Sequence, residues 1–202
     1  MTDSEALYTI CRENNIVKMR QALAGGFNPN QRLHERGIKA LHIVASKGYQ
    51  EMASLLLQQP DIELNPRQDS GETPLHWAAY FGEQEVVALL LQQPGIELNP
   101  KTQDTGETPL HFAALPWDRL TPSARGPAGP AVLRHLLACP GTDPNVKNQA
   151  GKTPIMELLA MPGNCLGNAL GSNLVGHLRA FVEFDRVDLD DQDGRSLEDL
   201  AR

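Results

Sequence analysis

The stretch Gly71-Glu-Thr-Pro-Leu-His-Trp-Ala-Ala79 returns almost unchanged as Gly106-Glu-Thr-Pro-Leu-His-Phe-Ala-Ala114. Glycine recurs at the same relative place and divides the chain into units of 34, 35, 45 and 43 residues. These glycines are Gly37, Gly71, Gly106, Gly151 and Gly194. A motif that returns at such an interval indicates supersecondary units that bury their apolar faces against one another. The pattern therefore predicts a stack of neighbouring units without a single closed core.

One unit of this stack predicts two helices and a polar turn. Thr73 is suited to cap a helix and Pro74 to occupy its first position, so a first helix is expected over residues 74–80. A run rich in valine and leucine from Glu83 to Gln92 predicts a second helix, and its apolar load requires burial against neighbours. The residues from Pro94 to Gly106 then form a hairpin-like finger.

The period, together with Thr-Pro-Leu-His at residues 73–76 and 108–111, resembles the ankyrin repeat, whose unit is about 33 residues. This resemblance implies an all-α ankyrin-repeat solenoid made of helix-turn-helix pairs with hairpin-like fingers. We expect about five units and a partial C-terminal one, all within a single domain over residues 1–202. The expected units are residues 1–36 (an N-terminal cap repeat), 37–70, 71–105, 106–150, 151–193 and 194–202 (partial).

The two longer units carry their extra residues between the paired helices. Residues 115–129 and 161–173 are rich in proline, glycine and asparagine, and both segments are predicted to be loops. Two interpretations remain open, namely tolerated insertions at exposed tips and a second contact surface. After Gly194 no second helix follows, which is expected either for a frayed last cap or for a chain that continues past Arg202.

Charge and composition exclude several function classes. The chain has 18 lysines and arginines against 25 aspartates and glutamates, and the net charge of −7 disfavours nucleic acid and anionic membranes as partners. No apolar stretch approaches the roughly 18 residues of a membrane span. Cys11, Cys139 and Cys165 follow neither a disulfide nor a zinc-binding pattern. We expect a monomer in the cytoplasm, with the nucleus as a second compartment.

Histidine recurs once per repeat, at His42, His76 and His111. Stacked helical layers lie about 8–10 Å apart, whereas zinc needs its nitrogen ligands at about 2.0–2.1 Å, so these rings are not expected to share an ion. We expect them to tie the capping threonine to the neighbouring turn. No Ser/His/Asp or Cys/His set shares a motif either. The prediction is a non-enzymatic protein with no catalytic residue, no metal site and no cofactor.

The resemblance also implies where partner contacts lie. Tyr80 and Phe81 follow the Ala-Ala pair and are expected on the concave side as anchors, although one of them could instead fill a gap between repeats. Acidic contact positions favour a partner with a basic and apolar segment. The predicted protein-binding residues are Arg67, Asp69, Glu72, Tyr80, Phe81, Lys101, Asp104, Glu107 and Trp117.

A basic residue stands two positions after each finger asparagine, at Arg32, Arg67, Lys101 and Lys147. Such a row suggests a phosphate site, but ordinary solvated charge is the simpler interpretation. The resemblance further implies that the finger asparagines are candidates for hydroxylation by a dioxygenase. The residues in that place are Asn65, Asn99 and Asn145.

Three functions are compatible with this pattern. The first is a non-enzymatic protein–protein interaction module that binds one protein on its concave surface. The second is the N-terminal recognition arm of a larger enzyme, adaptor or pathogen effector. The third is an ankyrin-type inhibitor that masks a basic segment of a transcription factor.

Overall fold

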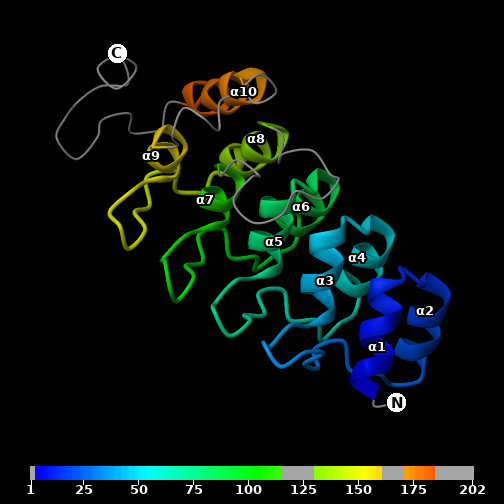
Figure 1. The fold of residues 1–202 in the computed structure, drawn as a ribbon. Helices are drawn as coiled ribbons and strands as arrows, with labels where there is room; N and C mark the ends of the chain where they lie inside the picture. The colour runs from blue at the N-terminus through cyan, green and yellow to red at the C-terminus, as the bar shows by residue number, and fades with distance from the viewer. Residues whose placement is uncertain (1–2, 115–129, 161–170, 185–202) are drawn as a thin grey trace.

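A computed structural model describes residues 3–114, 130–160 and 171–184, the last range with side chains from residue 176 onward. Within these ranges the structure contains ten helices and no strand (Figure 1). The helices are α1 (Asp3–Arg12), α2 (Ile16–Ala24), α3 (Ala40–Lys47), α4 (Gln50–Leu57), α5 (Pro74–Phe81), α6 (Gln84–Leu91), α7 (Pro109–Ala114), α8 (Pro130–Ala138), α9 (Pro154–Leu159) and α10 (Gly171–Val182).

Sharp turns between paired helices depend on glycine. Gly48 ends α3 and Gly82 ends α5, both in the left-handed conformation with φ of 66° and 70°. A residue without a Cβ adopts this conformation at little cost, so the chain can reverse and begin the next helix two residues later. Helix α3 therefore packs against α4, and α5 packs against α6.

The helices form two rows (Figure 1). The inner row of α1, α3, α5, α7 and α9 lies beside the fingers, and the outer row of α2, α4, α6, α8 and α10 lies behind it. Helices α3, α5 and α7 lie closer to one another than α4, α6 and α8 do, so the array curves with its inner row and fingers on the concave side. The predicted all-α stack of helix pairs is confirmed.

The hydrophobic core is a continuous strip between the two rows. The leucine of the repeated motif lies at its centre, and Leu41, Leu75 and Leu110 are each at most 1% exposed. Ala40 stands where later repeats have proline, yet α3 begins at this residue and buries it completely. Packing against α1 and α5 thus preserves the helix without the preformed proline backbone.

The loop prediction over residues 161–173 is wrong for its last three residues, because helix α10 begins at Gly171. Residues 161–170 lie outside the described part of the chain. Packing of α10 against α8 outweighs the poor helix propensity of its first residues. The predicted loop over residues 115–129 and the partial repeat over 194–202 lie outside the described part of the chain.

Candidate functional site

The histidine of each Thr-Pro-Leu-His motif ties one repeat to the next. The Nδ1 atom of His76 accepts a hydrogen bond from the backbone N–H of Thr73 at 3.1 Å. The ring proton therefore lies on Nε2, which donates to the carbonyl oxygen of Glu107 at 3.2 Å. The equivalent pairs are His42 with the Glu72 carbonyl and His111 with the Lys152 carbonyl, each at 3.1 Å. The predicted role of tying the capping threonine to the next turn is confirmed for His76 and His111, which contact Thr73 and Thr108. His42 makes the same link from Lys39, where the threonine is absent.

Burial keeps these histidines neutral. It lowers the pKa of His42 and that of His76 from 6.5 to about 4, and it also lowers the pKa of His111. Among the described residues, no group of three histidine, cysteine, aspartate or glutamate side chains could hold a metal ion. Cys11 is fully buried, and burial raises its pKa to about 12, so its thiol is not an activated nucleophile.

Neighbouring fingers are joined by asparagine amides. The Nδ2 atom of Asn65 donates to the carbonyl oxygen of Gly95 at 2.8 Å, and its Oδ1 atom accepts from the backbone N–H of Glu97 at 2.8 Å. The same bridge links Asn30 to Asp61 and Glu63, and Asn99 to Gly141 and Asp143. These asparagines therefore set the spacing of the fingers. Hydroxylation of Asn65, Asn99 and Asn145 stays a prediction.

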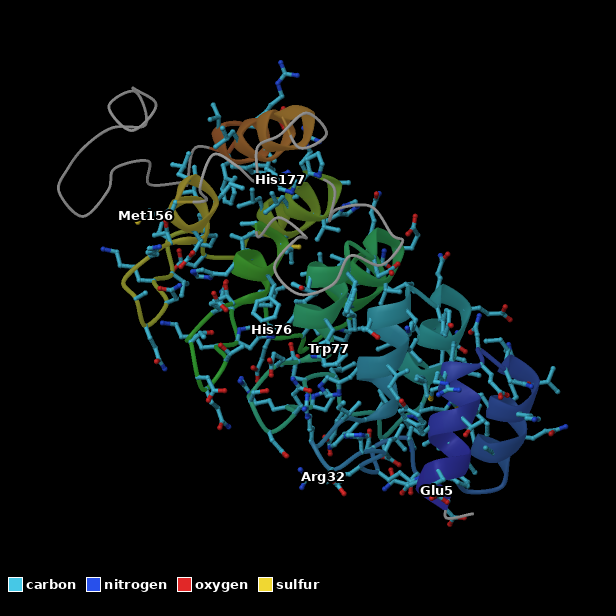
Figure 2. All side chains as sticks on the ribbon, in the orientation of Figure 1. Glu5, Arg32, His76, Trp77, Met156 and His177 are labelled. Carbon is cyan, nitrogen blue, oxygen red and sulfur yellow. The ribbon has the colours of Figure 1, made fainter. Side chains whose placement is uncertain are left out.

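Three of the four basic residues that follow the finger asparagines make contacts within the chain. Arg67 pairs with the carboxylate of Glu97 at 2.7 Å and also donates to the carbonyl oxygen of Lys101 at 3.1 Å. The corresponding contacts are the ion pair of Arg32 with Asp69 and a 3.0 Å hydrogen bond from Lys101 to the Lys147 carbonyl. Each contact reaches the next finger, and Arg32 lies at the edge of the fingers in Figure 2. These contacts favour a structural role over a phosphate site, and a surface pair of this kind contributes at most about 1 kcal/mol.

Four aromatic rings and one carboxylate line a hollow over α5 and α7, which we call the aromatic hollow. Its volume is about 270 Å³, and its lining residues are Glu72, Trp77, Tyr80, Phe81 and Phe112. All five side chains are partly exposed. The hollow therefore opens on the inner row of helices, where the array is concave.

The rings of the aromatic hollow meet at steep angles. Tyr80 lies edge-on to Phe81, with centroids 5.0 Å apart and planes at 88°, and edge-on to Phe112 at 6.0 Å and 70°. Trp77 is tilted by 47° to Phe81 at 6.2 Å. Edge-to-face contacts of this kind are favourable because the positive edge of one ring meets the negative face of the next. The four rings hence form one preformed cluster.

Glu72 supplies the negative charge of the aromatic hollow. Its Oε2 atom accepts hydrogen bonds from the Ser70 hydroxyl and the Gln68 amide, each at 2.5 Å. Partial burial by itself would raise the pKa of this carboxyl, but these hydrogen bonds outweigh burial and lower the pKa. The carboxylate is therefore ionised at neutral pH and held at the rim of the hollow.

The structure brings together only part of the predicted binding set. Tyr80, Phe81 and Glu72 share the aromatic hollow, whereas Arg67, Asp69 and Lys101 are engaged between fingers. Asp104 is exposed on its finger, and Glu107 accepts a 2.9 Å hydrogen bond from Thr105. Trp117 lies outside the described residues.

Sequence reasoning missed two rings of the hollow, Trp77 and Phe112. Both occupy the position directly after the motif histidine, where the preceding repeat has Ile43. Ile43 is only 7% exposed, so this position by itself suggests core packing. The exchange of an aliphatic for a large aromatic residue in two successive repeats was the available signal.

Two further observations concern the class of protein. In the three ranges that the structure describes, no helix is long and apolar enough to cross a membrane. A family model of ankyrin repeats in three copies matches residues 7–102, and a model of a single ankyrin repeat matches residues 105–149. A comparison with curated proteins gave no match.

Proposed function

The chain belongs to the ankyrin-repeat family, whose repeats generally act as protein–protein interaction modules, and on this basis we propose that it is a non-enzymatic module holding one protein partner on its concave surface. Residues 1–202 form one domain in this proposal, with units that begin at residues 1, 37, 71, 106, 151 and 194. It also places a monomeric protein without a cofactor in the cytoplasm, with the nucleus as a second compartment.

The aromatic hollow is the observation that carries this proposal. Its rings are partly exposed, whereas the leucines of the repeated motif beside them are buried. Aromatic side chains offer a large contact area and few rotatable bonds, so they lose little entropy when a partner covers them. A preformed, partly open cluster of such rings is the setting in which binding hot spots are found.

Charge favours a partner segment that is basic as well as apolar. Glu72 lies in the hollow, Asp104 is exposed on the finger over residues 94–106, and Glu107 follows that finger directly. The whole chain carries a net charge of −7, which adds a long-range attraction for cationic partners. Complementary charge of this kind raises the association rate more than it raises affinity.

Affinity capture from the native host, followed by mass spectrometry, tests the proposal. The comparison uses the wild type, the double variant Tyr80→Ala/Phe81→Ala, and a control Val17→Ala, which removes an apolar group that is 65% exposed on α2. We expect the double variant to bind the captured partner about ten-fold or more weakly and the control to bind it normally. A correctly folded double variant that keeps full affinity would refute the placement. The identity of the partner decides between this module, a recognition arm and an inhibitor of a DNA-binding protein.

A further inference from the structure

The chemistry of the aromatic hollow restricts what it can hold. With a volume of about 270 Å³, the hollow is large enough to take the end of one side chain. Four of its five lining residues are aromatic, and the fifth is the carboxylate of Glu72. The hollow therefore combines an apolar wall with one fixed negative charge.

This combination favours a cation over an apolar side chain. The face of an aromatic ring carries negative potential, and a positive group within about 6 Å of the ring centroid is attracted to it. The ring plane of Tyr80 lies at 88° to that of Phe81 and at 70° to that of Phe112. Rings at such angles line the hollow on more than one side. An apolar side chain would displace water from the Glu72 carboxylate and return no compensating interaction.

The hollow suits a methylated ammonium better than a free one. An unmodified lysine carries three N–H donors, each of which needs an acceptor when water is removed. Among the lining residues the charged acceptor is Glu72, and its Oε2 atom already accepts two hydrogen bonds from Ser70 and Gln68. The Oε1 atom of Glu72 and the Tyr80 hydroxyl would then have to accept all three donors of a free lysine. Methyl groups replace the donors, keep the positive charge and pack against the rings.

We propose that the aromatic hollow of Trp77, Tyr80, Phe81, Phe112 and Glu72 binds a methylated lysine side chain of the protein partner. This inference rests on the proposed function and adds the chemical state of the residue that is recognised. The Glu72 carboxylate supplies the charge that complements the ammonium, and the rings supply its contact surface.

Three capped amino acids test the inference as probes: N-acetyl amides of lysine, of Nε-trimethyllysine, and of the neutral analogue with carbon in place of the quaternary nitrogen. Binding is followed by NMR through the indole N–H of Trp77, which a Trp117→Phe variant distinguishes from the second tryptophan of the chain. We expect trimethyllysine to shift the Trp77 resonance and to bind at least about five-fold more tightly than either other probe.

Two variants separate charge from packing. Glu72→Gln removes the charge with little change in shape, and we expect it to weaken trimethyllysine while the neutral analogue binds as before. The matched control is Glu85→Gln, which changes an exposed glutamate on the outer helix α6 and should leave both probes unaffected. Tyr80→Leu, which keeps apolar volume but removes one ring, should abolish the preference for the charged probe. Thermal unfolding of each variant shows that it remains folded.

Three results would contradict the binding of a methylated lysine in the aromatic hollow. Equal affinity for trimethyllysine and its neutral analogue, or an equal effect of Glu72→Gln and Glu85→Gln, would show that no ammonium is recognised. An unshifted Trp77 resonance with every probe would exclude the hollow as a side-chain site. Failure here leaves the proposed function standing if the Tyr80→Ala/Phe81→Ala variant still loses the captured partner.

Discussion

Acidification from pH 7.5 to pH 5 should destabilise this protein through its motif histidines. The folded-state pKa values of His42 and His76 are about 4, below the value of 6.5 for an unperturbed histidine. Between these two values the unfolded chain binds more protons than the folded one. The free energy of unfolding therefore falls as the pH drops from 6.5 toward 4, and the histidines cause no further loss below that range.

The size of the effect follows from the two pKa values. A difference between 6.5 and about 4 corresponds to about 3 kcal/mol per histidine over the whole window. At pH 5 most of this window has been crossed, so His42 and His76 should each remove about 2 kcal/mol of stability. His111, whose pKa burial also lowers, adds to the loss. A total of about 4 kcal/mol is a large part of the stability of an ordinary domain.

Urea unfolding at 25 °C, followed by circular dichroism at several pH values between 7.5 and 5, measures this loss. His76→Gln removes one buried titrating ring and should reduce the difference between the two ends of the pH range by about 2 kcal/mol. His34→Gln is the matched control because His34 is exposed. A wild type equally stable at pH 7.5 and pH 5 would refute the reasoning, as would an equal effect of the two substitutions.

Three further predictions concern the packing and are measured by urea unfolding. Gly71→Ala should lower the free energy of unfolding more than Gly95→Ala. The backbone φ is similar at the two glycines (91° and 89°), but only at residue 71 would an added Cβ meet a backbone nitrogen, that of Gln103, at 2.8 Å. Equal losses would contradict the close approach of neighbouring fingers. Leu90→Ala should destabilise the protein by about 2–5 kcal/mol because Leu90 is fully buried. Leu89→Ala should cost less than half as much because Leu89 is partly exposed, and similar losses would show that Leu90 does not lie on the buried face of α6. Asn65→Ala should cost about 1–3 kcal/mol by removing both bonds of its amide, and unchanged stability would show that these bridges do not hold the fingers.

The helix pairs could be predicted because local chemistry and the repeat period agree. Threonine and proline set where α5 begins, and Gly82 sets where it ends, so the predicted bounds differ from the observed ones by about one residue. The role of His76 followed from the same period, because the spacing of layers excludes a shared metal ion. In each case the information lies within one repeat and its nearest neighbour.

Contacts that depend on how repeats are stacked could not be predicted. Arg67 pairs with Glu97, 30 residues away, because the fingers lie in register, and no local pattern specifies that pairing. Trp77 and Phe112 occupy a position that is buried in the preceding repeat, and their partial exposure depends on the shape of the inner face. Helix α10 begins at a glycine because packing on α8 outweighs propensity.

Chemical-shift mapping of the isotopically labelled chain with its captured partner tests the central claim most directly. The account predicts that the partner perturbs the Trp77 indole N–H and the backbone amides of α5, α7 and the fingers beside them. Perturbations confined to α4, α6 and α8, with an unchanged Trp77 resonance, would place the partner on the outer row and contradict the account.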